Sequence, residues 1–262
     1  MKSVESAVTS ESSPGLRDFL YDGVLAGATI TLWPIAGERP DATAAARIRA
    51  MAWIPIAGFA LGATLAILDY GAGFISSSLS RSIATLLTAA ILSGGMTIRG
   101  LADTVEALRR GVRPASTGLA RIGPIGGIAV VGAFALEVWC LAQIHDEAGR
   151  AAAIVLATML SRWSIVPIGY GLRPLERWGL GLPFEGGISF REFSVSSTIA
   201  LSVAMGLYRN AGLAAIIAAA LAILAMRLLI SRRLGGASGF ALAGGCAAVE
   251  IVTIAALAAI RI

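Results

Sequence analysis

Residues 122–144 read IGPIGGIAVVGAFALEVWCLAQI and contain one charged side chain, Glu137. An unbroken apolar run of this length matches the roughly 20 residues that a helix needs to cross a bilayer. Backbone groups in lipid must be hydrogen-bonded internally, so only helices and closed barrels span membranes. The run does not alternate between apolar and polar residues as a barrel strand does. The stretch therefore predicts a membrane-spanning helix.

Similar apolar runs recur along the chain, and the composition does not fit a water-soluble domain. Of the 262 residues, 56% are hydrophobic and 14% are charged, whereas soluble domains carry about 25% charged residues. We therefore predict an all-α, polytopic transmembrane helical bundle with about seven spans. The predicted spans are 52–68, 82–98, 122–144, 151–170, 193–208, 211–230 and 240–260.

The N-terminal part differs from the rest of the chain. Residues 1–19 are polar and rich in serine, which predicts a cytoplasmic tail followed by a single integral-membrane domain over 20–262. The apolar stretch 19–37 is interrupted by Asp22, Gly27 and Pro34. These interruptions favour an interfacial or re-entrant helix over a full span.

The positive net charge is explained by membrane topology. A net charge of +5 could indicate nucleic-acid binding, but the arginines are spread over loops, so we predict no nucleic-acid partner. Cytoplasmic loops of membrane proteins are enriched in Arg and Lys, and a cytoplasmic N-terminus places most of these residues inside. The polar loops 99–121, 171–192 and 231–239 then all face the cytoplasm, where nucleotides are available.

Two acidic residues, Asp103 and Glu106, lie in the segment Gly100 to Leu108. Their three-residue spacing places both carboxylates on one face of a helix. Mg²⁺ prefers hard oxygen ligands of this kind together with substrate phosphates, so the pair could hold this cation. The alternative is a solvated helix start, where acidic side chains interact favourably with the helix dipole.

Two further segments combine arginine with glycine. Arg121 precedes the Gly-rich start of a predicted helix, where free backbone N–H groups can bind an anion; a membrane anchor followed by close helix packing is the alternative. Arg232 and Arg233 precede Gly235 and Gly236. Paired arginines beside a flexible Gly-rich loop suit phosphate binding, and a loop anchored by arginines is the ordinary alternative.

Other polar or reactive residues lie in or beside the predicted spans. Glu137 and Arg162 would be costly in lipid and could pair with each other across the bundle. Cys140 and Cys246 each lie inside an apolar run and are predicted to be small core residues. His145, the one histidine, is predicted to be a solvated loop residue.

Several landmarks occur in a fixed order over nearly the whole chain: Thr31 to Pro34, Trp53 to Gly58, Gly100 to Thr104, Arg121 to Gly123, Leu160 to Trp163, Gly179 to Gly181 and Arg232 to Gly239. Together they resemble the cobalamin synthase family, the membrane adenosylcobinamide-GDP ribazoletransferases. The order of the landmarks is far more specific than any one of them.

The resemblance implies a Mg²⁺-dependent enzyme of late cobalamin biosynthesis in the bacterial cytoplasmic (inner) membrane. Such an enzyme joins adenosylcobinamide-GDP to α-ribazole, or to its 5′-phosphate, and releases GMP. The resemblance implies that Asp103 and Glu106 are the catalytic and metal-binding residues. It implies a set of substrate-binding and phosphate-binding residues: Arg121, Arg232, Arg233, Gly235 and Gly236. A homo-oligomer, or a partner among other membrane proteins of cobalamin biosynthesis, is compatible with it.

Three positions depart from the acidic pattern of the family. Arg99, Leu119 and Phe240 stand where the family has aspartates, and an arginine repels a divalent cation that a carboxylate attracts. One hypothesis is a transferase with a reduced set of carboxylates. The alternative is a catalytically degenerate relative that binds cobinamide-type ligands or partners an active enzyme. A small-solute transporter is less favoured, because the distinctive residues cluster on one side of the membrane.

Overall fold

The computed structural model describes residues 21–27, 48–74, 77–111, 123–173, 175 and 187–260. Within these ranges the chain folds into helices without a β-strand, which confirms the all-α prediction. The predicted tail 1–19 lies outside the described residues, and so does most of the stretch 19–37. Residues 21–27 of that stretch are helical.

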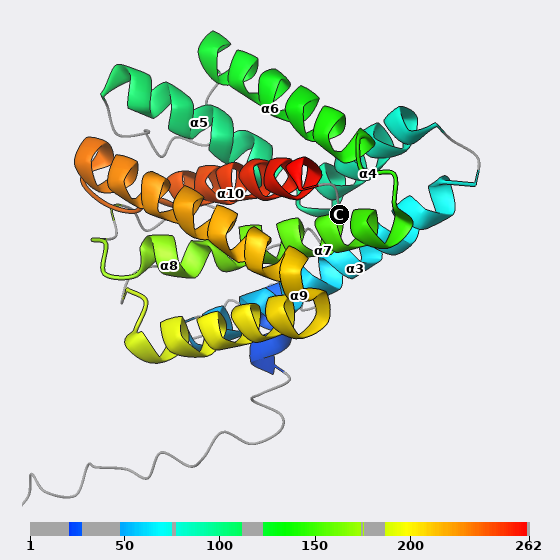
Figure 1. Cartoon of the computed structure of the whole chain (residues 1–262). Helices are drawn as coiled ribbons and strands as arrows, with labels where there is room; N and C mark the ends of the chain where they lie inside the picture. The colour runs from blue at the N-terminus through cyan, green and yellow to red at the C-terminus, as the bar shows by residue number, and fades with distance from the viewer. Residues whose placement is uncertain are drawn as a thin grey trace, which may run out of the picture.

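The helices pack side by side as a bundle (Figure 1). In chain order the elements are η1 (Met51–Trp53), α3 (Ile54–Ala72), α4 (Ser78–Leu92), α5 (Met96–Arg110), α6 (Pro124–Ala142), α7 (Glu147–Trp163), α8 (Ile165–Gly169), α9 (Phe190–Leu229), η2 (Ile230–Leu234) and α10 (Gly239–Ala259).

Among the described residues, five helical segments are long and apolar enough to cross a membrane: Ile48–Ala72, Pro124–Ala142, Glu147–Gly169, Phe190–Leu234 and Gly239–Ala259. The bent pair α4–α5 makes a sixth if it counts as one span. The polytopic bundle is therefore confirmed. This count takes Phe190–Leu234 as one segment, although it contains two of the predicted spans, 193–208 and 211–230.

The predicted span 82–98 is wrong as a single straight helix. Helix α4 ends at Leu92, α5 begins at Met96, and the two helices are bent by 85° at the break. Gly94 and Gly95 adopt φ values of 65° and 66°, a left-handed conformation that glycine adopts without steric cost. This glycine pair ends α4 and gives the segment with Asp103 a helix of its own.

Helix α9 is divided at Arg209, whose φ of 42° and ψ of −111° are non-helical. Figure 1 shows that the chain reverses direction there, so the two halves of α9 run side by side in opposite directions. The sequence places the predicted boundary between 208 and 211, which agrees with this break. The two predicted spans are therefore present as the arms of a helical hairpin.

Helix α7 forms the centre of the bundle, since 89% of its most apolar stretch is buried. Its closest neighbour is α3, which approaches through glycines: a Cβ atom added at Gly62 would lie 2.9 Å from the Cα of Val155. Small residues at such crossings let helix backbones meet closely in membranes. Cys140 and Cys246 are buried and free, as predicted for core residues.

A buried ion network joins α3, α4 and α7 at one end of the bundle. The Asp69 carboxylate, 2% exposed, accepts hydrogen bonds from Arg150 at 2.8 and 2.9 Å and from Arg81 at 2.8 Å. Thr85 donates a further bond of 2.6 Å. Glu147 then pairs with Arg81 through both carboxylate oxygens, at 2.7 and 2.6 Å. The network lies at the opposite end from Gly111 and Gly239 (Figure 1).

Candidate functional site

Helix α5 carries the predicted acidic residues and is held tightly against α10. A Cβ atom added at Gly100 would lie 2.7 Å from the backbone nitrogen of Gly244, and one added at Gly244 would lie 2.8 Å from the Gly100 carbonyl oxygen. The Thr104 hydroxyl donates a 3.1 Å hydrogen bond to the Phe240 carbonyl. These contacts bring the segment 100–104 against the start of α10, so the landmark Gly100 to Thr104 lies beside the end of the landmark Arg232 to Gly239.

Replacing Gly100 by alanine is expected to lower the free energy of unfolding by about 1–3 kcal/mol, because the added methyl group overpacks the α5–α10 contact. The matched control is Gly132→Ala on α6, where nothing lies within 4 Å of an added Cβ. Alanine is the better helix former, so the control should be neutral or slightly stabilising. Thermal unfolding in detergent, followed by circular dichroism, compares the two; equal midpoints would contradict the close packing.

Asp103 lies on α5 with one arginine beside it. Its Oδ2 atom is 3.6 Å from Nε of Arg99, one helical turn earlier, and its side chain is 15% exposed. The Arg99 guanidinium also lies over the Phe240 ring, 5.6 Å from its centroid. Two positions that depart from the acidic pattern, Arg99 and Phe240, are therefore in contact with each other, and one of them pairs with Asp103.

Glu106 is the second acidic residue of α5. Its Oε1 atom accepts from Arg109 at 3.0 Å and from Arg110 at 2.8 Å, while its Oε2 atom is buried without a hydrogen-bond partner among the described residues. A Cβ atom added at Gly123 would lie 2.6 Å from Glu106 Cδ. Glycine at 123 thus lets the start of α6 approach this carboxylate. Arg121, two residues earlier, lies outside the described residues.

No group of three or more His, Cys, Asp or Glu side chains that could hold a metal ion occurs in the described parts of the chain. Asp103 and Glu106 are the predicted metal ligands, and each of them is paired with arginine. A divalent cation at this pair would take its other ligands from outside these side chains. Mg²⁺ commonly takes such ligands from water and substrate phosphates.

Arg232 and Arg233 lie in η2 and are exposed. Gly235 ends this turn with φ 74°, and its N–H donates to the Ile230 carbonyl at 3.1 Å. At Gly236 an added Cβ atom would lie 2.8 Å from the Leu175 side chain. The two predicted phosphate-binding glycines therefore have a structural role: they shape the turn that presents the arginines.

The described part of the loop 171–192 is fixed beside this turn. The backbone of Ala237 exchanges hydrogen bonds of 2.9 Å with Arg173 and Leu175. Arg227 donates to the carbonyls of Pro167, at 3.0 Å, and of Tyr170 at the end of α8. The sequence analysis did not single out Arg227, so it missed this role. The end of α5, the end of α8 and the start of α10 lie at one end of the bundle (Figure 1).

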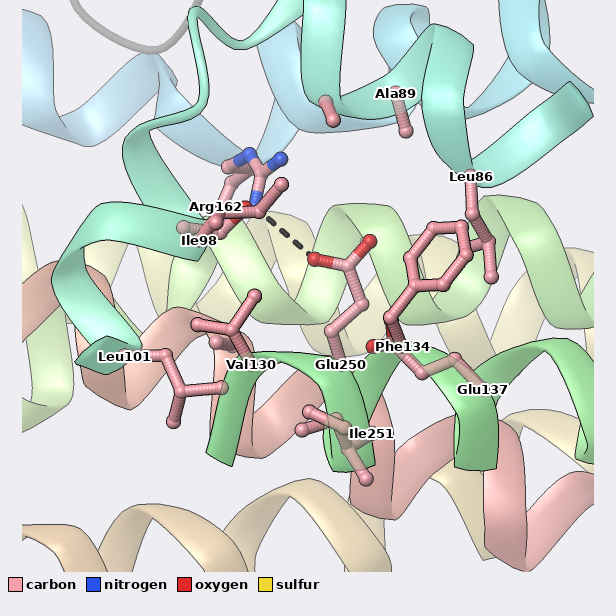
Figure 2. A pocket seen from close by; sticks show the side chains of 14 residues that line it. Leu86, Ala89, Ile98, Leu101, Val130, Phe134, Glu137, Arg162, Glu250 and Ile251 are labelled. Atoms are coloured by element: carbon pink, nitrogen blue, oxygen red, sulfur yellow. Dashed lines mark hydrogen bonds and ion pairs between the residues drawn. The ribbon is translucent and has the colours of Figure 1, made fainter. Parts of the chain in front are cut away.

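The predicted ion pair between Glu137 and Arg162 is wrong, because Arg162 pairs with a different glutamate. Arg162, 1% exposed, pairs with Glu250 of α10 at 3.3 Å, and the Ser161 hydroxyl bonds to both side chains at 2.9 and 3.1 Å. Glu137 lies across the same cavity, which has a volume of about 50 Å³ (Figure 2). α10 packs directly on α7, so Glu250 reaches the guanidinium, while Glu137 approaches from α6.

Leu101 and Thr97 of α5 also line this cavity. Asp103 follows Leu101 by two residues, which is about 200° around a helix. The cavity and Asp103 therefore lie on opposite faces of α5. The candidate site consists of the Asp103 and Glu106 face of α5, the start of α6 at Gly123, and the η2 turn with Arg232 and Arg233.

Comparisons with known proteins agree with this assembly of landmarks. Residues 23–260 match the family described as cobalamin-5-phosphate synthase. A protein of Roseiflexus sp. (strain RS-1) named adenosylcobinamide-GDP ribazoletransferase is 30% identical over 240 residues, which cover 87% of this chain and 85% of that protein.

Two further proteins of that name, from Herpetosiphon aurantiacus and Geotalea daltonii, are each 28% identical to the chain. Their matches cover 88% and 81% of this chain, and 93% and 87% of their own lengths. No solved structure matches the chain. Since the family match extends over almost the whole chain, the protein belongs to the cobalamin-5-phosphate synthase family.

Proposed function

We propose that the protein is an adenosylcobinamide-GDP ribazoletransferase, which joins adenosylcobinamide-GDP to α-ribazole, or its 5′-phosphate, and releases GMP. Family membership over residues 23–260 supports this activity, as do the names of its relatives. The structural observation that carries the proposal is the contact between the segment Gly100–Thr104 and the start of α10. It brings the acidic landmark and the arginine landmark to one end of the bundle.

The reaction is a displacement at phosphorus. A ribose hydroxyl oxygen of α-ribazole forms a bond to the phosphorus that bears the cobinamide group. The bond from that phosphorus to the GMP oxygen breaks, and the hydroxyl proton passes to a base. Such transfers depend mainly on positioning and on neutralising the charge of the phosphoryl oxygens.

Asp103 and Glu106 would hold a Mg²⁺ ion. The fit rests on two observations: the two carboxylates share one face of α5, and Glu106 Oε2 has no partner among the described residues. One or two carboxylates are the usual protein share when substrate phosphates complete the shell of Mg²⁺. Bound there, the ion would polarise phosphoryl oxygens and stabilise the leaving GMP.

The arginines and glycines would bind the substrate. Arg232 and Arg233 are exposed beside α5, and guanidinium groups bind phosphate oxygens through paired hydrogen bonds. Gly235 and Gly236 would present them. Arg121, which lies outside the described residues, would be a further phosphate-binding residue, as the family resemblance implies.

We also propose that the protein lies in the bacterial inner membrane. The polar loops 99–121, 171–192 and 231–239 would then face the cytoplasm, where the guanine nucleotide is supplied. Partners would be the bilayer, the two substrates and either a second copy of the chain or other membrane proteins of cobalamin biosynthesis. A catalytically degenerate relative is not favoured, because carboxylates are present at positions 103 and 106 and the relatives carry the enzyme name.

Reconstitution tests the activity. Purified protein in liposomes receives adenosylcobinamide-GDP, α-ribazole and Mg²⁺, and GMP and the cobamide product are followed over time. Equal amounts of both products, formed with Mg²⁺ and not after chelation, are expected. Binding of adenosylcobinamide-GDP without turnover would favour the catalytically degenerate relative. The absence of both binding and turnover would contradict both hypotheses.

A further inference from the structure

Arg99 makes a loose ion pair at the candidate site. The distance from its Nε to Asp103 Oδ2 is 3.6 Å, and 37% of its side chain is exposed. The structural pair of Arg150 with Asp69 is much tighter, at 2.8 Å with both side chains buried. The Asp103 side chain is 15% exposed, and a partly exposed pair at this long distance contributes less to stability than a short buried one. The Arg99 guanidinium is therefore available to a ligand at small cost.

The Phe240 ring orients this guanidinium. The Arg99 Cζ lies 5.6 Å from the ring centroid, within the range of a cation–π contact. Phe240 is itself fixed, because its carbonyl accepts the hydrogen bond from Thr104 of α5. A guanidinium in a cation–π contact keeps N–H groups that can bind two oxygens of a phosphate at once.

The charge around Arg99 favours an anion. Helix α5 carries three arginines, Arg99, Arg109 and Arg110, against the two carboxylates Asp103 and Glu106. The neighbouring turn η2 adds two exposed arginines. A diphosphate diester brings two negative charges to this positive surface. A divalent cation alone would meet repulsion from Arg99 at Asp103.

We propose that Arg99 is a phosphate-positioning residue and that it competes with the divalent cation for Asp103. When the diphosphate of the substrate arrives, the Arg99 guanidinium pairs with a non-bridging phosphate oxygen instead of Asp103. Asp103 is thereby freed as a metal ligand. Arg99 supplies one of the positive charges at the diphosphate. This inference rests on the proposed function, since it names the contact that the adenosylcobinamide-GDP diphosphate makes.

The test measures metal binding and substrate kinetics separately in Arg99→Gln, Arg99→Lys and the control Arg191→Gln. Arg191 is an exposed arginine at the start of α9, outside the proposed site. Without substrate, Arg99→Gln should bind Mn²⁺ about two- to fivefold more tightly, as followed by electron paramagnetic resonance, since a competing and partly exposed ion pair is removed. The control should bind Mn²⁺ as the unsubstituted protein does.

In the transferase assay, KM for adenosylcobinamide-GDP should rise about tenfold or more in Arg99→Gln, the loss expected for a hydrogen bond to a charged group. KM for α-ribazole should stay unchanged. The KM of Arg99→Lys for adenosylcobinamide-GDP should lie between those of the unsubstituted protein and Arg99→Gln, because lysine keeps the charge but lacks the bidentate geometry of arginine.

Each alternative outcome has a clear meaning. Unchanged Mn²⁺ binding and unchanged KM in Arg99→Gln would overturn the inference while leaving the proposed function intact. A rise in KM for both substrates together with a lower unfolding midpoint would show a structural role and also overturn it. An unsubstituted protein that neither binds adenosylcobinamide-GDP nor releases GMP would instead defeat the proposed function.

Discussion

Replacing Asp103 by asparagine is expected to lower the transferase rate by about a hundredfold or more and to leave the bundle folded. A metal-held charge at a phosphoryl group contributes several kcal/mol to the transition state, and each 1.4 kcal/mol is about tenfold in rate. Among the described residues the side chain makes one loose ion pair, at 3.6 Å, so its removal should cost little stability. The initial rate of GMP release, with the unfolding midpoint measured in parallel, checks the prediction.

The conservative variant Asp103→Glu provides the control. It keeps a carboxylate on the same face of α5 and should recover part of the activity, with a higher Mg²⁺ requirement because the ligand atom has moved. An Asp103→Asn protein with a rate close to that of the unsubstituted chain would remove Asp103 from the chemistry.

Replacing Asp69 by asparagine should have the largest effect on stability, a loss of about 3–5 kcal/mol. Asp69 is 2% exposed and is the common acceptor for Arg81, Arg150 and Thr85. Neutralising it leaves the buried Arg150 charge without its counter-ion, the situation in which one partner of a buried pair is removed. Thermal or denaturant unfolding in detergent measures the loss.

Glu147 offers a matched test within the same network. Its carboxylate also pairs with Arg81, at 2.6 Å, but its side chain is 53% exposed. Because water replaces the lost partner there, Glu147→Gln should cost less than about 1 kcal/mol. Equal losses for the two variants would mean that burial does not set the strength of this network.

The spans were predictable from the sequence because apolar length is a local property. The runs 122–144 and 240–260 correspond closely to α6 and α10, and residue 209 falls between two predicted spans and ends the first arm of α9. The break at Gly94 and Gly95 was missed. Gly94 and Gly95 adopt positive φ values, and the mean hydropathy of a window does not record backbone dihedral angles.

Side-chain partners were harder to predict than helices. Arg162 had two acidic candidates within the spans, and only the packing of α7 on α10 selects Glu250 over Glu137. The contact between Arg99 and Phe240 joins positions far apart in the chain. The roles of Asp103 and Glu106 came from a resemblance, and their chemistry still rests on the experiments above.

The reversal at Arg209 has a practical consequence for topology. Its backbone lies in a region that non-glycine residues rarely adopt, it is exposed, and it forms the tip of the helical hairpin at the opposite end from Gly239 (Figure 1). Insertions are tolerated best at exposed tips of this kind. A short epitope placed after Arg209 should leave the transferase site undisturbed. If the polar loops 99–121, 171–192 and 231–239 face the cytoplasm, an antibody added to intact spheroplasts should reach this epitope.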